Sequence, residues 1–218
     1  KNLNEKIDNF IYENNDRIDK IVNEKSEVII DIDEISLKGN HNLENVLFII
    51  GIGKILNIPN EVISQFLKTT KALEHRLENF FLKQNTLFIN DSKGTNVEST
   101  IKAIEAFKNR IVLIAGGENK KICNEELIKK INERVGFVYL IGETGTILAE
   151  EMNKVGYKKY KNLGTLEKVL LDIKQNIDFE DSQTILFSPA TASFDQFKNF
   201  EERGRIFKEL TNKILGEK

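Results

Sequence analysis

From residue 76 onward, short apolar runs alternate with stretches whose hydrophobic residues recur every three to four positions. The apolar runs predict β-strands, and the periodic stretches predict amphipathic helices. We expect strands at 76–82, 86–90, 110–115, 137–141, 157–160 and 184–187, and helices at 97–107, 124–134, 145–155, 165–175 and 199–215. The first two strands should form a hairpin. The remaining alternation predicts a Rossmann-like α/β domain with a mostly parallel sheet and helices on both faces.

The N-terminal third has a different pattern. Turn-prone residues separate apolar positions near 9–12, 17–22 and 27–32, which predicts a small β-meander. An amphipathic helix over the first eleven residues is the alternative. Helical spacing then predicts a helix over 42–57, and Pro59 with Asn60 opens a second one that reaches residue 68. The segment 69–75 lacks a strong pattern, so we expect it to link two domains, 1–70 and 71–218.

Composition excludes several classes of protein. The charged residues make up 30% of the chain, carry both signs and sum to −2, which argues against the clustered basic surface of a nucleic-acid-binding protein. Apolar runs such as 46–50 are too short to cross a membrane. The single cysteine, Cys123, cannot form an internal disulfide. Without a secretory signal pattern, we expect a cytoplasmic protein, and we expect it to be a monomer.

The most informative segment is 188–204, SPATASFDQFKNFEERG. It follows a predicted strand, contains several small residues and leads into the last predicted helix. Small side chains let backbone amides approach a ligand closely, and a helix N-terminus favours negative charge. The segment therefore predicts a binding site for an anionic ligand.

A second segment, 90–96 (NDSKGTN), lies where the strand 86–90 ends and the helix 97–107 begins. Open α/β sheets bind ligands at the carboxyl ends of their strands. A turn with Asn96 as the helix cap is the structural alternative. A carboxylate, two hydroxyls and an ammonium within five residues exceed what a cap needs, so we expect this loop to bind a ligand.

Two further segments carry cations. The segment 73–78 (LEHRLE) contains Arg76, whose planar guanidinium suits phosphate, although a surface salt-bridge cluster around His75 is the alternative.

Gly116 and Gly117 follow a predicted strand and precede Lys120, which could meet a ligand or be solvated. The pattern GxGxxG is missing there, which argues against a dinucleotide site.

Asn42 and Asn45 lie three residues apart at the start of a predicted helix. That spacing places both amides on one face of its first turn. Each amide offers a donor and an acceptor, so the pair could bind the edge of an adenine ring, with helix capping as the alternative.

From about residue 34 to the C-terminus, the segments SPATASFDQF, NDSKGTN and LEHRLE resemble the D-glutamate-adding ligases of peptidoglycan synthesis. The resemblance implies an ATP-dependent amide-bond ligase. In such a reaction the γ-phosphate of ATP passes to the carboxylate of UDP-N-acetylmuramoyl-L-alanine, and the amine of D-glutamate attacks the acyl phosphate. The implied partners are ATP, Mg²⁺, D-glutamate and the nucleotide-linked acceptor.

The resemblance also assigns residues. It places ATP against Asn42, Asn45, Arg76, Asp91 and Lys93. Of these, Arg76 and Lys93 would be catalytic. It places D-glutamate against Thr95, Lys120, Ser193, Phe194 and Phe200, with Lys121 as an alternative to Lys120.

The chain has no GxxxxGK[ST] phosphate loop, and Gly51 to Lys54 is too short to form one. By resemblance, we expect the phosphate loop, the magnesium ligands and the nucleotide-sugar site upstream, so that this chain would be a C-terminal fragment that is inactive alone. Its first 70 residues would end the central ATP-binding domain, and 71–218 would be the glutamate-binding domain. The alternatives are a sibling ligase that adds another amino acid and a non-catalytic Rossmann-like module that binds an acidic metabolite.

Overall fold

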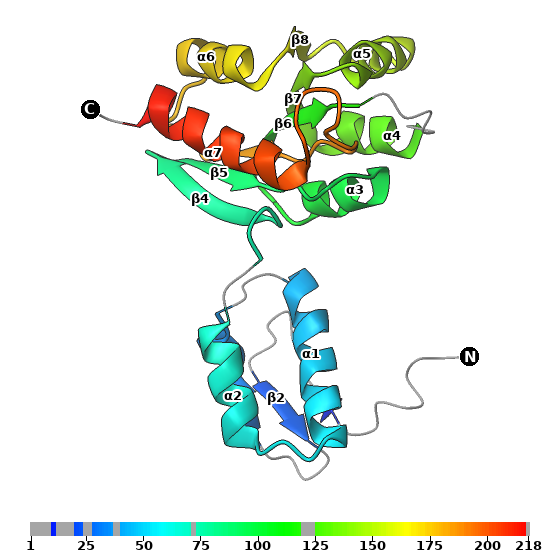
Figure 1. Ribbon diagram of the computed structural model, residues 1–218. Helices are drawn as coiled ribbons and strands as arrows, with labels where there is room; N and C mark the ends of the chain where they lie inside the picture. Colours follow the sequence, from blue (N-terminus) through cyan, green and yellow to red (C-terminus); the bar gives the residue numbers. More distant parts are fainter. Residues whose placement is uncertain are drawn as a thin grey trace. The chain divides into compact units, whose positions relative to one another are not determined.

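The computed structural model describes residues 10–11, 20–23, 28–36, 40–70, 73–118 and 125–216. Contacts within the chain divide it into two compact units, Lys1–Ala72 and Leu73–Lys218, which we call unit 1 and unit 2 (Figure 1). Each unit has its own core. None of the described helices is both long and apolar enough to cross a membrane.

Unit 1 contains a small antiparallel sheet and two helices. The sheet has the order β1 (Phe10–Ile11), β2 (Lys20–Asn23) and β3 (Val28–Asp31), which confirms the predicted meander. The helices are α1 (Asn40–Ile55) and α2 (Asn60–Thr69), also as predicted. Their shared core consists of Ile29, Ile30, Ile35, Val46, Ile50, Ile63 and Leu67.

Unit 2 is built on a six-stranded sheet in the order β4-β5-β9-β6-β7-β8. β4 (Glu78–Lys83) runs antiparallel to β5 (Thr86–Asn90), which confirms the hairpin. The other neighbours are parallel: β9 (Gln183–Phe187), β6 (Arg110–Gly116), β7 (Val135–Ile141) and β8 (Tyr160–Gly164). The predicted mostly parallel sheet is therefore confirmed.

Helices cover both faces of this sheet (Figure 1). On one face, α3 (Val97–Glu105), α4 (Glu125–Arg134) and α5 (Thr144–Lys154) enclose a first core. On the other, α6 (Leu166–Asn176) and α7 (Phe200–Leu215) enclose a second. The central strands contribute side chains to both cores, because successive side chains of a strand point to opposite faces of the sheet. In β6, for example, Leu113 joins the first core and Val112 the second.

One predicted strand was misplaced. The sequence pattern favoured 157–160, whereas β8 runs from Tyr160 to Gly164. Tyr157 instead packs into the first core, and its hydroxyl donates to the carbonyl of Val135 at 3.1 Å. β8 is the edge strand and exposes Lys161 and Asn162, so its sequence lacks the apolar run that marks the buried strands.

The topology brings three strand ends to one edge of the sheet. β9 lies between β5 and β6, and Phe187 is in register with both Asn90 and Ile114. Because the three strands are parallel, the loops that follow them leave from the same edge. These loops begin at Asp91, Gly117 and Ser188.

Candidate functional site

Backbone hydrogen bonds join the loops at this edge. The Asp91 N–H donates to the carbonyl of Phe187 at 2.8 Å, and the Ala190 N–H donates to that of Gly94 at 2.9 Å. The Gly116 N–H donates to the Pro189 carbonyl at 2.8 Å. The loop after β9 therefore contacts the ends of both neighbouring strands.

Asp91 is buried within this junction. The Ser188 hydroxyl donates to one carboxylate oxygen at 2.7 Å, and the Leu77 N–H donates to the other at 3.2 Å. Burial raises the pKa of Asp91 from 3.8 to about 6, and these hydrogen bonds offset part of the effect. The hydroxyls of Ser188 and of Thr100 on α3 are also hydrogen-bonded to each other, at 2.9 Å. Asp91 thus binds three segments of unit 2 together.

Gly94 allows this close packing. A Cβ at that position would lie 2.6 Å from Asp91 Oδ2 and 2.7 Å from Ser188 Oγ. Any larger residue would have to displace the Asp91–Ser188 hydrogen bond. The glycine in the NDSKGTN segment is therefore required by packing.

Arg203 on α7 is completely enclosed and reaches two of the loops. Its guanidinium donates to the hydroxyl and carbonyl of Ser92 at 3.0 and 2.8 Å. It also donates to the carbonyls of Thr191 and Ala192 at 3.0 and 3.1 Å. Burial lowers the pKa of Arg203 to about 10, and the guanidinium remains charged at neutral pH.

His75 is buried, which contradicts the surface position that the salt-bridge alternative implied, although its ring nitrogens lie 3.9 and 3.8 Å from carboxylate oxygens of Glu74 and Glu78. The two N–H groups of the Asn90 side-chain amide are shared among three acceptors: His75 Nδ1 at 2.9 Å, Glu78 Oε2 at 3.1 Å and the Gly204 carbonyl at 3.3 Å. The His75 carbonyl in turn accepts from the Lys93 N–H at 3.0 Å. The start of unit 2 is therefore fixed to β5, to α7 and to the loop that carries Lys93.

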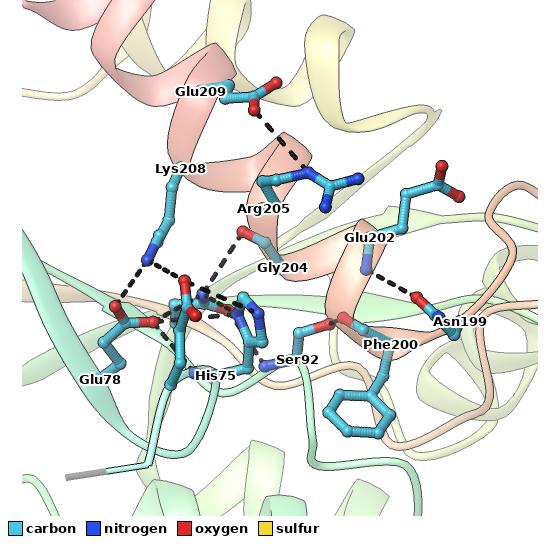
Figure 2. Close-up of polar contacts among 12 residues, drawn as sticks. His75, Glu78, Ser92, Asn199, Phe200, Glu202, Gly204, Arg205, Lys208 and Glu209 are labelled. Atoms are coloured by element: carbon cyan, nitrogen blue, oxygen red, sulfur yellow. Dashed lines mark hydrogen bonds and ion pairs between the residues drawn. The ribbon is translucent and has the colours of Figure 1, made fainter.

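Lys208 completes the polar network beside His75. Its ammonium lies 2.7 Å from a carboxylate oxygen of Glu78 (Figure 2). It lies at the same distance from a carboxylate oxygen of Glu74. The hydrogen bond from Lys208 lowers the pKa of Glu74. Glu74, His75 and Glu78 place potential metal-ligand atoms within 4.8 Å of one another, but Lys208 already supplies the positive charge there.

A cleft of about 330 Å³ opens beside this network. Its lining residues are Leu73, Glu74, His75, Lys93, Phe200, Glu201 and Arg205. The Lys93 ammonium lies 5.9 Å from the centre of the Phe200 ring, within the range of a cation–π contact. The cleft thus offers two cations, Lys93 and Arg205, and an aromatic face.

The other predicted site residues lie as follows. Arg76 is exposed next to the buried His75, and Asn45 is exposed on α1. Thr95 is partly exposed, Ser193 is buried and Phe194 is 64% exposed. Lys120 and Lys121, like the side chain of Asn42, lie outside the described parts.

The structure brings the loops of Thr95 and Ser193 to one edge of the sheet, and Lys93 and Phe200 to one cleft. Asn96 caps α3, since its side chain accepts from the Ser99 N–H at 2.8 Å. The capping role that the sequence offered for Asn96 is therefore confirmed.

Sequence reasoning missed Arg203 and Ser188. Arg203 follows Phe200 by three residues and precedes Phe207 by four, so helical spacing places it on the apolar face of α7. That position was a detectable signal of a buried cation. Nothing local distinguishes Ser188, whose partner Asp91 lies 97 residues away.

Residues 75–191, more than half of the chain, match the family model for "Mur ligase, glutamate ligase domain". The chain is 46% identical over 200 residues to the UDP-N-acetylmuramoylalanine–D-glutamate ligase of Fusobacterium nucleatum, covering 91% of this chain and 46% of the relative. It is 38% identical over 213 residues to the ligase of the same name from Caldicellulosiruptor bescii, covering 96% of this chain and 45% of the relative. The chain spans about half the length of these curated relatives.

Solved structures show the same fold. MurF from Acinetobacter baumannii matches with a TM-score of 0.60 and 18% identity, covering 80% of this chain and 39% of that structure. The UDP-N-acetylmuramate-alanine ligase MurC from Thermotoga maritima matches with a TM-score of 0.57 and 15% identity, covering 79% and 38%. These structures share the fold, and the family match over residues 75–191 shows that the chain belongs to the Mur ligase family through its glutamate ligase domain.

Proposed function

We propose that this chain is the part of an ATP-dependent ligase that binds D-glutamate and presents it to UDP-N-acetylmuramoyl-L-alanine for peptidoglycan synthesis. One observation carries the proposal. The loops 91–96 and 188–199 are hydrogen-bonded to each other at the carboxyl edge of the sheet, in a chain whose relatives are named D-glutamate ligases. That edge is where α/β sheets bind ligands.

In the proposed reaction, the acceptor carboxylate takes the γ-phosphoryl group of ATP to give an acyl phosphate and ADP. The D-glutamate amine then attacks the acyl carbon. A C–N bond forms, the C–O bond to phosphate breaks, and the amine loses a proton. Two anionic substrates and ATP must be held together, so cations and backbone amides should carry most of the catalysis.

We assign the phosphate side to Lys93 and Arg76. Both are exposed, and Lys93 lines the cleft beside Phe200. A lysine ammonium can neutralise charge on a phosphoryl group, and a guanidinium can bind two phosphate oxygens at once. Asp91 is buried and engaged by Ser188 and Leu77, which favours a role in shaping the loop around ATP. Asn42 and Asn45 stay assigned to adenine.

We assign the amino-acid side to Thr95, Lys120 and Ser193, with Phe194 and Phe200 as walls. D-Glutamate has two carboxylates, so one ammonium and two hydroxyls suit it chemically. Each of the three polar residues follows a different one of the adjacent parallel strands β5, β6 and β9.

Mg²⁺ should accompany ATP, because divalent cations neutralise the phosphate oxygens during phosphoryl transfer. Glu74, His75 and Glu78 do not suit that ion. Lys208 lies 2.7 Å from both carboxylates, and Mg²⁺ prefers oxygen ligands in an octahedral arrangement. We expect its ligands elsewhere in the ligase, and we expect the ligase to work in the cytoplasm as a monomer.

The test is a ligation assay on the whole ligase with ATP, Mg²⁺ and UDP-N-acetylmuramoyl-L-alanine. Phosphate release and product mass are measured with D-glutamate, L-glutamate, D-alanine and L-lysine in turn. Of the four amino acids, we expect only D-glutamate to give phosphate release and a new amide product. Faster ligation of another amino acid would identify a sibling ligase, and binding of D-glutamate without any product would favour a non-catalytic module.

A further inference from the structure

Arg203 is a buried cation that the proposed reaction does not use. It is the largest fully enclosed side chain among the described residues, and it lies 5.9 Å from the ring of Phe187 in the core. The ion pairs between described residues do not include it. Backbone carbonyls and one hydroxyl receive its hydrogen bonds instead. A buried charge is costly, and an apolar side chain of similar volume often gives equal stability.

The acceptors of Arg203 belong to two ligand loops. Ser92, in the loop after β5, accepts through its hydroxyl and its carbonyl. Thr191 and Ala192, in the loop after β9, accept through their carbonyls. The planar guanidinium therefore sets the spacing between a loop that carries Thr95 and a loop that carries Ser193.

The loop after β6 begins against the same group. A Cβ at Gly117 would lie 3.1 Å from the Arg203 guanidinium and 2.5 Å from the Ala192 carbonyl oxygen. That carbonyl also accepts from the Glu118 N–H at 3.0 Å. Arg203 thus lies against residues of all three loops: Ser92, Thr191 with Ala192, and Gly117.

We propose that Arg203 is a positioning residue for D-glutamate: its four hydrogen bonds hold the loops after β5 and β9 at the spacing that the amino acid requires, and it does not touch the ligand. This inference rests on the proposed function. Ser92 connects this hydrogen-bond network to the start of α7, because its hydroxyl also donates to the Phe200 carbonyl at 2.8 Å (Figure 2).

The test compares Arg203→Lys and Arg203→Met in the whole ligase with Arg110→Lys and Arg110→Met as matched controls. Arg110 is exposed and begins β6, at the opposite edge of the sheet. Lysine keeps the charge but cannot donate to both loops in the same fork geometry. We expect Arg203→Lys to raise the KM for D-glutamate by about 10-fold or more, with the KM for ATP changed less than about 3-fold, because small displacements of binding groups cost rate steeply. The controls should stay within about 2-fold of the wild type.

A purely structural role gives a different result. The midpoint temperature of thermal unfolding would then fall, and activity would fall with the folded fraction. The KM for D-glutamate would stay constant. That outcome overturns the proposal. Lack of D-glutamate-dependent turnover in the wild type would instead refute the proposed function, so the two failures are distinguishable.

Ser92→Ala keeps the test decisive if the Arg203 variants do not fold. It removes the acceptor of the Arg203 Nε and the donor to the Phe200 carbonyl, and leaves the Ser92 carbonyl in place. We expect a rise of about 3- to 10-fold in the KM for D-glutamate, in line with the loss of these hydrogen bonds. Combined with Arg203→Lys, it should add little, because both changes break the same contact. An unchanged KM in Ser92→Ala, or fully additive effects, would contradict the proposal.

Discussion

At the scale of single residues, Asp91 couples the site to pH. Its pKa in the folded chain is about 6, raised from 3.8 mainly by burial. A carboxyl group whose pKa is raised on folding favours the folded state at low pH, and that advantage is lost as the pH rises through about 6. The difference of roughly two pKa units corresponds to about 3 kcal/mol.

Asp91→Asn should therefore stabilise the chain relative to the wild type more at pH 8 than at pH 4, by up to about 3 kcal/mol. Asparagine keeps an oxygen for the Leu77 N–H, and its amide can donate to Ser188, which can then donate to Thr100. Urea unfolding at both pH values measures the difference, with the exposed Asp181→Asn as the control. A difference that does not change with pH would contradict the buried, protonatable state of Asp91.

Lys93 should act in the chemical step. We expect Lys93→Ala in the whole ligase to lower kcat by about 30- to 1000-fold, because a charge-assisted contact to the transition state contributes about 2 to 4 kcal/mol. The KM for D-glutamate should change less than about 3-fold. Lys154→Ala, at an exposed lysine that ends α5, is the control. An unchanged kcat with a raised KM for D-glutamate would move Lys93 into the amino-acid pocket.

Lys120 and Ser193 should contribute unequally to D-glutamate binding. Loss of a charged hydrogen bond costs about 1.5 to 3 kcal/mol, and loss of a neutral one about 0.5 to 1.5 kcal/mol. We therefore expect Lys120→Ala to raise the KM for D-glutamate by about 10-fold or more, and Ser193→Ala by about 2- to 10-fold. Initial rates over a range of D-glutamate concentrations measure both. Equal effects would indicate that Lys120 does not neutralise a carboxylate of the substrate.

At the scale of elements, α7 must approach His75 closely, and Gly204 permits it. A Cβ at position 204 would lie 2.3 Å from His75 Nδ1. Gly204→Ala should destabilise unit 2 by about 1 to 3 kcal/mol, because the buried His75 ring cannot move aside without breaking its hydrogen bond to the Asn90 amide. The control is Gly145→Ala in α5, whose Cβ would meet the exposed side chain of Asn162 at 3.0 Å and should change stability by less than about 1 kcal/mol. Urea unfolding that shows no loss for Gly204→Ala would refute this packing argument.

The sequence predicted the buried strands well because both of their faces are apolar. β6, β7 and β9 read as continuous hydrophobic runs, whereas the edge strand β8 exposes Lys161 and Asn162 and was misplaced. The loop after β5 was found through its density of polar residues, and the loop after β9 through its small residues and the helix that follows it. The surface alternative for His75 was wrong because its hydrogen-bond partner Asn90 and its packing neighbour Gly204 lie 15 and 129 positions away in the chain, where no local pattern reaches.

At the scale of the whole molecule, the sheet of unit 2 separates two cores, and its carboxyl edge carries the residues assigned to chemistry. The adjacency of β5, β9 and β6 brings together loops that are far apart in sequence. Arg203 holds two of these loops through hydrogen bonds to Ser92, Thr191 and Ala192. The hydrogen bond between His75 and Asn90 holds the segment that carries Arg76. On the proposed function, this arrangement holds the amino acid beside the cleft that Lys93 lines.

The most direct test is a crystal structure of the whole ligase with D-glutamate and ADP bound. We expect one carboxylate of D-glutamate to lie within about 3 Å of the Lys120 ammonium, and the hydroxyls of Thr95 and Ser193 to donate to its carboxylates. Arg203 should keep its contacts to Ser92 and Thr191 without touching the ligand. D-Glutamate bound away from these three strand ends would contradict the assignment of Thr95, Lys120 and Ser193 to its carboxylates.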